Sequence, residues 1–174
     1  PLNDYALATR LSYFLWKSAP DQQLHRPAGK GSLKEPIVLT GQVERMLSDL
    51  RAGRFINDFL DGWLQLREID ATTPDEKLYP EFDDQLRQAM LAETRLFFRE
   101  LLDRNLGVRH FIKSDFTFLN RRLARHYGID GVVGEKMRLV DLPEDSVRGG
   151  LMTQASILKV TANGTLTSPV KRGN

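Results

Sequence analysis

The sequence of 174 residues contains no cysteine. Disulfides, thiolate chemistry, zinc held by thiolates and covalent attachment of haem within these residues are therefore excluded. No uninterrupted apolar run is longer than a few residues, so we expect no membrane span. The sequence also lacks an excess of one charge, because 25 basic residues stand against 23 acidic ones and the net charge is +2. This near balance gives little support to nucleic-acid binding, and we predict none.

The composition is that of a folded domain. Hydrophobic residues make up 41% of the chain and charged residues 28%, which suffices for a buried core and excludes a disordered tail. The three histidines, His25, His110 and His126, are scattered, and none belongs to a His-Glu-x-x-His pair. We therefore predict no metal site and no cofactor within this chain.

Residues 82–104 carry the longest pattern of helical period. On a helical wheel of about 100° per residue, apolar side chains cover most of the circumference. They are Phe82, Leu86, Ala89, Met90, Leu91, Leu96, Phe97, Phe98, Leu101 and Leu102. A helix that is apolar on most of its surface packs on several sides. We therefore predict a mainly α fold: a helical bundle-like domain around this one long central helix, with a small irregular or short-strand C-terminal segment.

Shorter signals predict the elements on either side. Asn3 or Asp4 caps a first helix, and Asp21 begins a short second helix that ends near His25. The Pro and Gly content of residues 26–32 predicts a surface loop. Toward the C-terminus, a helix over residues 121–127 is closed by Gly128, and weak alternation at residues 136–140 indicates a short strand. Residues 151–160 fit a helix and a strand equally well.

The composition changes near residue 130, from long helical patterns to a sequence rich in Gly and Thr. We therefore predict a helical domain over residues 1–130, a linker or turn region over 131–147, and the start of a second domain, truncated in this chain, over 148–174.

Two acidic residues, Glu93 and Glu100, fall inside the apolar arc of the predicted central helix. A buried carboxylate needs a partner or has a raised pKa, and both are common at functional sites. The step of seven residues from Glu93 to Glu100 rises about 10.5 Å, which is too far for two carboxyl groups to share a proton. We interpret both as structural carboxylates, each paired with an arginine of a neighbouring helix, among Arg10, Arg54 or Arg122. A functional acid is the alternative.

The C-terminal stretch has the most suggestive polar pattern. If Ser168 and Pro169 open a helix, the free backbone N–H groups and the following basic side chains form an anion site. Its candidate residues are Arg148, Asn163, Thr167, Ser168, Lys171 and Arg172. A polar loop with a helix cap is the alternative. A second basic cluster at residues 121–126 is typical of a solvated helix face, with polyanion binding as a weaker interpretation.

Several runs of this sequence resemble one uncharacterised family, the domain of unknown function 1592. They are RLSYFLWKSAPDQQL, FINDFLDGWLQLREID, KLYPEFDDQLRQAMLAETRLFF and DFTFLNRRLARHYGI. The run RGGLMTQASILKVTANGTLTSPVKRG resembles the start of a second family, the domain of unknown function 1588, which continues beyond it into a helix missing here. The two families occur side by side in large exported proteins of planctomycete type that often also carry a c-type cytochrome-like domain.

The resemblance implies a periplasmic or cell-surface location and a neighbouring domain that carries haem. It implies no catalytic residues and no haem in this chain. We therefore expect a non-catalytic helical module, structural or partner-docking, whose partner is the cytochrome-like domain of the same protein. The alternative is part of a redox or polymer-degrading enzyme with a polar or anion-binding site in the C-terminal stretch. The sequence leaves the oligomeric state open.

Overall fold

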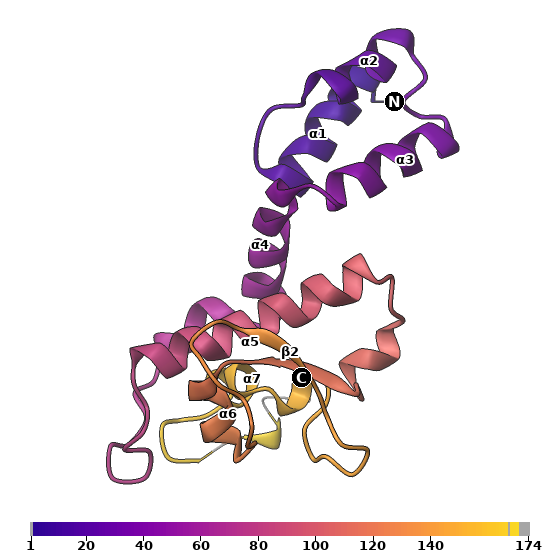
Figure 1. Ribbon diagram of the computed structural model, residues 1–174. Helices are drawn as coiled ribbons and strands as arrows, with labels where there is room; N and C mark the ends of the chain where they lie inside the picture. The colour runs from indigo at the N-terminus through magenta and orange to yellow at the C-terminus, as the bar shows by residue number, and fades with distance from the viewer. Residues whose placement is uncertain (1, 167, 171–174) are drawn as a thin grey trace. The chain divides into compact units, whose positions relative to one another are not determined.

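The computed structural model describes residues 2–166 and 168–170. It divides into two compact units, Pro1–Phe59 and Leu60–Asn174, and each is described by itself. Most of the described residues that belong to regular elements are helical, so the prediction of a mainly α chain is confirmed (Figure 1).

The first unit is built from helices alone. It contains α1 (Asp4–Trp16), α2 (Gln22–Lys30), α3 (Pro36–Leu47), the short 3-10 helix η1 (Leu50–Ala52) and most of α4 (Gly53–Trp63). The side chains of Asn3 and Asp21 cap α1 and α2 by accepting hydrogen bonds from backbone N–H groups three residues later. Both capping sites agree with the sequence prediction.

Trp16 is the largest fully buried side chain of the first unit. Its Nε1–H donates a hydrogen bond to the backbone oxygen of Met46 at 2.9 Å. The guanidinium of Arg51 lies 3.4 Å from the centre of a Trp16 ring, a cation–π contact. The first unit therefore has an apolar core of its own, to which Ala8, Leu15, Leu24, Ala28, Leu33 and Met46 contribute.

The surface loop predicted over residues 26–32 is wrong for most of its length, because α2 continues through Pro27 to Lys30. A proline inside a helix removes one backbone hydrogen bond. Leu24 and Ala28, one turn apart, are both buried in the core of the first unit. Their burial favours the helix over the break that Pro27 would favour by itself.

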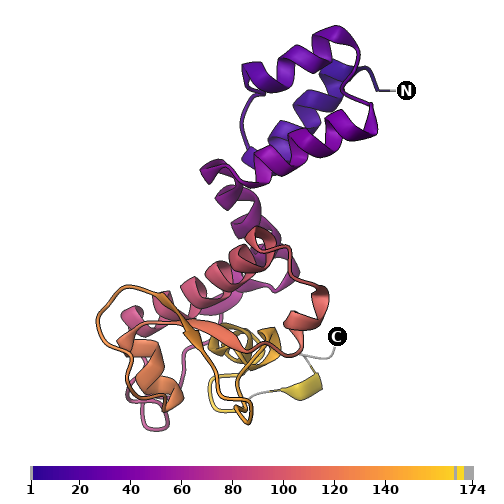
Figure 2. The same ribbon diagram turned by 45° about the vertical axis from the view of Figure 1, so that its right-hand side comes forward.

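The second unit is organised around α5 (Asp84–Asp103), which Asp83 caps at its N-terminus. The elements that follow α5 are η3 (Val108–Phe111), β1 (Phe116–Leu119), α6 (Arg121–Tyr127), β2 (Arg138–Asp141), η4 (Leu151–Thr153) and α7 (Ala155–Val160). Helix α4 enters this unit at Leu60, and the 3-10 helix η2 (Leu66–Asp70) precedes α5. The strands, α6 and α7 lie on one side of α5 in both ribbon views (Figures 1 and 2).

Helix α5 buries side chains on several faces, as the apolar pattern of residues 82–104 predicts. One group, with Leu86 and Met90, packs against Leu123 of α6 and Ala155 of α7. Another, with Phe97 and Leu101, packs against Phe116 and Leu151. The expectation of a single helix at the centre of the whole chain is not confirmed, because the first unit has its own core.

The two strands form one antiparallel ladder, in which Phe116 lies opposite Asp141 and Leu119 opposite Arg138. The short strand predicted at residues 136–140 is thus confirmed with slightly shifted bounds. Residues 151–160, for which the sequence left helix and strand open, are helical. The domain boundary placed at residues 131–147 stays a prediction.

Candidate functional site

Glu93 lies on a buried face of α5 and is 1% exposed. Its Oε1 accepts a hydrogen bond from the Thr117 hydroxyl at 2.7 Å, and its Oε2 accepts one from the Tyr127 hydroxyl at 2.5 Å. The Tyr127 hydroxyl oxygen in turn accepts a hydrogen bond from the backbone N–H of Ala155 at 2.7 Å. One carboxyl group is therefore linked, directly or through Tyr127, to β1, α6 and α7.

Burial raises the pKa of Glu93 from 4.5 to about 7, because the ionised carboxylate loses its hydration in this core. Hydrogen bonds from Tyr127 and Thr117 and the charge of Arg148 act in the other direction. Burial and the adjacent carboxyl also raise the pKa of Tyr127 well above its usual value of 10, so its hydroxyl remains a donor at neutral pH.

Glu93 takes two hydroxyl donors instead of the arginine partner that we expected. Of the arginines considered, Arg54 donates to the backbone oxygen of Trp16 and Arg122 pairs with Asp83. The other predicted carboxylate, Glu100, is only partly buried, and its Oε1 lies 3.6 Å from Nη1 of Arg104, the C-cap residue of the same helix. The expected pairing of Glu100 with an arginine of a neighbouring helix is therefore wrong. The structural role of both carboxylates stays a prediction.

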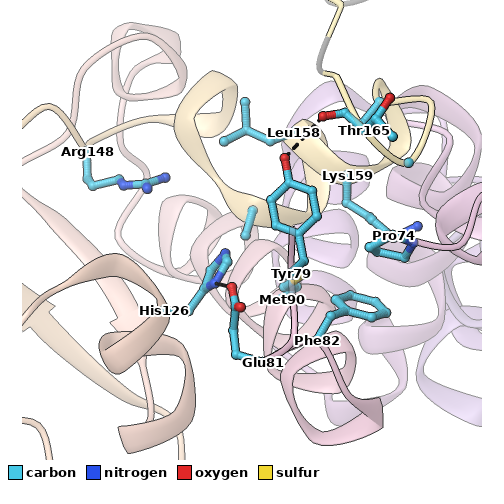
Figure 3. A pocket seen from close by; sticks show the side chains of 13 residues that line it. Pro74, Tyr79, Glu81, Phe82, Met90, His126, Arg148, Leu158, Lys159 and Thr165 are labelled. Carbon is cyan, nitrogen blue, oxygen red and sulfur yellow. Dashed lines mark hydrogen bonds and ion pairs between the residues drawn. The ribbon is translucent and has the colours of Figure 1, made fainter. Parts of the chain in front are cut away.

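A pocket of about 250 Å³ lies beside this buried network, within the second unit (Figure 3). Its apolar lining comes from the segment before α5, from α5 itself, and from α7 with the turn after it: Pro74, Phe82, Met90, Ala155, Leu158 and Ala162. Its polar lining includes Tyr79, Glu81, His126, Arg148, Lys159 and Thr165. Neither Glu93 nor Tyr127 is among the lining residues, so the buried carboxyl does not open into the pocket.

Arg148 is partly buried at one side of the pocket, and its guanidinium points toward the middle of it (Figure 3). The guanidinium carbon lies 4.1 Å from the centre of the Tyr127 ring, and Nη1 donates to the backbone oxygen of Thr153 at 2.7 Å. Among the described residues, no carboxylate lies within ion-pair distance of Arg148. The other N–H groups of this side chain have no protein acceptor in the same residues.

Two glycines follow Arg148, and there the backbone passes close to another segment of the chain. Gly149 and Gly150 have φ values of +136° and +105°, which side chains rarely allow. A Cβ at Gly149 would lie 2.4 Å from the backbone oxygen of Ser114, and one at Gly150 equally close to that of Ile112. The chain can therefore pass this closely over residues 112–114 only with glycine at both positions.

The second cation of the pocket, Lys159, is fully used by the protein. Its Nζ donates to the backbone oxygens of Ile69 at 2.8 Å and Thr72 at 2.5 Å, and lies 3.3 Å from the Thr72 hydroxyl. Burial lowers the pKa of Lys159, although Asp70 acts in the other direction. Lys159 therefore ties α7 to η2 and the segment after it, and its N–H donors are used within the protein.

A histidine–carboxylate pair lines the pocket near Arg148. Nδ1 of His126 lies 3.3 Å from Oε1 of Glu81. Burial lowers the pKa of His126, and the charges of Arg148 and Arg122 add to this, while Glu81 opposes it. The imidazole is therefore neutral at pH 7, and Glu81 supplies the negative charge of the pair.

The candidate anion residues of the C-terminal stretch do not all meet. Arg148 lines the pocket, but Asn163 is exposed, and its Oδ1 accepts hydrogen bonds from Thr165 and Leu166 within a turn. The backbone N–H of Ser168 donates to the oxygen of Thr161 at 3.2 Å and is thus used within the fold. The remaining three, Thr167, Lys171 and Arg172, lie outside the described residues.

Sequence reasoning missed His126, Glu81, Lys159 and Tyr127 as a group. Their positions span 79 residues of chain, and only the packing of α6 and α7 on α5 brings them together.

In the basic cluster at residues 121–126, fewer side chains are available to a polyanion than the sequence indicates. Arg121 pairs with Glu135 at 2.7 Å, Arg122 with Asp83 at 2.9 Å, and His126 with Glu81.

Two further findings concern residues 2–166 and 168–170. Within these ranges, no three His, Asp or Glu side chains are placed to hold a metal ion. No helix in the same ranges combines the length and the apolar character needed to cross a bilayer.

The chain was compared with known proteins. The model of one family, described as a protein of unknown function (DUF1592), matches residues 2–129. No curated protein and no solved structure matches the chain. Because this match covers well over half of the sequence, the chain belongs to the DUF1592 family of proteins of unknown function.

Proposed function

We propose that this chain is a binding module, not itself catalytic, within a larger exported protein, and that its partner places an anionic group on Arg148. The observation that carries the proposal is the state of this arginine. It is partly buried, stacks on Tyr127, faces a pocket and has no carboxylate partner among the described residues. A partly buried guanidinium that has no ion pair favours binding of an anion.

The buried position of Glu93, away from the pocket, supports a binding role of the chain over a catalytic one. A general acid must come within hydrogen-bond reach of the reacting group. Glu93 has the raised pKa expected of such an acid, but Thr117 and Tyr127 occupy both of its oxygens and it does not line the pocket.

The expected partner follows from the family resemblance of the sequence. We propose the cytochrome-like domain of the same protein as the partner, with haem held there and not in this chain. The proposed location is periplasmic or at the cell surface. The second domain of unknown function, 1588, is proposed to begin in the stretch that carries Arg148.

A calorimetric titration with that cytochrome-like domain, at low and high salt, tests the proposal. We expect saturable binding that weakens as salt rises, because a charge contact is screened. Arg148→Gln is expected to weaken it by about tenfold or more, since hydrogen bonds to charged groups contribute about 1.5–3 kcal/mol. Arg125→Gln is the matched control, because Arg125 is exposed on α6 and has no ion pair among the described residues. Absence of binding at both salt concentrations would refute the docking role.

Part of a redox or polymer-degrading enzyme is the second candidate. The observation that favours it is the His126–Glu81 pair, because a neutral imidazole oriented by a carboxylate is an arrangement suited to a general base. His126→Gln distinguishes the two candidates. An enzyme would lose turnover of its substrate, whereas the binding module would keep most of its affinity for the partner.

A further inference from the structure

We propose that the pocket of the second unit takes a single carboxylate group carried on an apolar body. This inference rests on the proposed binding role and names the chemistry of the group that reaches Arg148. It follows from the shape, the lining and the charges of the pocket, taken one at a time.

The pocket is small and its walls are mainly apolar. Its volume of about 250 Å³ lies below the roughly 300–1,000 Å³ of pockets that take drug-sized ligands. Phe82, Met90 and Leu158 supply large apolar surfaces, and Ala155 and Ala162 leave space between them. A short aliphatic or aromatic group gains free energy by leaving water for this lining.

Among the described residues that line the pocket, Arg148 is the cation whose N–H donors are not all used by the protein. Lys159 is saturated by two backbone oxygens and a hydroxyl. His126 is neutral at pH 7, and Glu81 is negative. Arg148 is the remaining cation among the described lining residues, and the Glu93 carboxyl on which its charge acts does not line the pocket. The free N–H groups of Arg148 present the planar fork that binds the two oxygens of a carboxylate.

Other charged head groups fit this arrangement poorly. A phosphate monoester carries about −1.5 to −2 charges at pH 7. Its second charge would face Glu81, and the described lining residues supply no cation beyond Arg148 and the saturated Lys159. An ammonium group would repel Arg148. A neutral hydroxyl would fill the apolar part but leave the guanidinium without its counter-ion.

The test compares four probes with one apolar chain and different head groups: octanoate, octyl phosphate, octylamine and octanol. Binding to the full chain is followed by NMR of labelled methionine methyl groups. Met90 lines the pocket, and Met46 lies in the core of the first unit and serves as the internal control. We expect octanoate to move the Met90 signal, leave Met46 unchanged and bind at least about tenfold more tightly than each of the other three.

Variants then assign the head-group preference to Arg148. Arg148→Met is expected to reduce the affinity for octanoate to that for octanol and to leave octanol binding unchanged. If this variant melts at a much lower temperature, Arg148→Lys provides the comparison, because it keeps the charge and loses the fork. Ala162→Phe, which fills the pocket, is expected to remove binding of both probes.

The carboxylate can belong to a small amphiphile or to the C-terminus of a peptide, so a second pair of probes separates these sources. They are acetyl-Gly-Gly-Leu with a free and with an amidated C-terminus. Tighter binding of the free peptide than of octanoate assigns the pocket to a peptide end, and the reverse assigns it to a small amphiphile. Equal or tighter binding of octyl phosphate or octylamine overturns the inference but leaves the docking role standing. Failure of all probes to move Met90 overturns the inference as well, while the titration with the cytochrome-like domain judges the docking role separately.

Discussion

Replacing Glu93 by Gln should change how the stability of the second unit depends on pH. The folded pKa of Glu93 is about 7 and the unfolded value 4.5, so the shift is worth about 3 kcal/mol. Below pH 4.5 the carboxyl is protonated in the folded and the unfolded state, so its ionisation does not lower the free energy of unfolding. As the pH rises from 4.5 to 7, the unfolded chain releases the proton first, and the free energy of unfolding falls. Above pH 7 the free energy of unfolding is lower by the full amount of about 3 kcal/mol.

Glutamine has nearly the same shape and does not titrate. The free energy of unfolding of wild type should therefore fall by about 3 kcal/mol relative to that of Glu93→Gln between pH 4 and pH 8. At pH 4 the variant is expected to be slightly less stable, by about 1 kcal/mol, because one hydroxyl must change its hydrogen-bonding role.

The measurement is urea unfolding followed by tryptophan fluorescence in a Trp16→Phe background. Each unit contains one of the two tryptophans, and Trp63 then reports on the second unit through its contacts with Phe98 and Phe111. Thr94→Val is the matched control, because the buried Thr94 hydroxyl bonds only the neutral side chains of Gln154 and Ser156. It should lower stability equally at both pH values. Parallel pH profiles for Glu93→Gln and wild type would refute the reasoning.

Three further changes test the surroundings of this site. Thr117→Val removes a hydrogen-bond donor to the Glu93 carboxylate, so the pKa of Glu93 should rise further. A ¹³C NMR titration of the Glu93 carboxyl measures this pKa, and an unchanged pKa would mean that the hydrogen bond is unimportant. Gly150→Ala should lower the free energy of unfolding of the second unit by more than about 3 kcal/mol in urea unfolding. The control, Gly131→Ala, should lower it by about 1–2 kcal/mol, because a Cβ at Gly131 would meet nothing within 4 Å. Equal losses for the two variants would contradict the close backbone approach at Gly150. Lys159→Met leaves the backbone oxygens of Ile69 and Thr72 without their donor, so it should lower the free energy of unfolding by about 1–3 kcal/mol. Amide hydrogen exchange in residues 69–73 should become faster. Unchanged exchange there would contradict the role of Lys159 in joining α7 to this segment.

Local signals in the sequence were enough to find most helices. The caps Asn3 and Asp21 and the closing Gly128 act within one turn of the backbone, so their effect can be read from neighbouring residues. The apolar arc of residues 82–104 also indicates that α5 is packed on several sides. It does not show which segments cover it, and the independent core of the first unit was missed for this reason.

The site depends on contacts between distant residues, which one sequence does not specify. Glu93 was singled out as a carboxylate in an apolar arc, but its partner Tyr127 lies 34 positions away and Ala155 a further 28. Strand β1 was missed because four residues, FTFL, have too little period to be recognised without their partner strand. Arg148 was named together with Asn163 and Ser168 as one polar set, and the sequence could not show that Arg148 lines a pocket while the Asn163 side chain accepts hydrogen bonds within a turn.

The pairing of β1 with β2 has a practical consequence for anyone who wishes to produce this protein in pieces. The family match ends at residue 129, but the partner strand of β1 lies at Arg138–Asp141. A fragment cut to the matched residues would expose the edge of Phe116–Leu119, together with the apolar surface of α5 that Ala155 and Leu151 cover. Open strand edges beside apolar surface promote self-association, so such a fragment is expected to aggregate during expression. An expression boundary placed after residue 160 keeps the strand pair and α7.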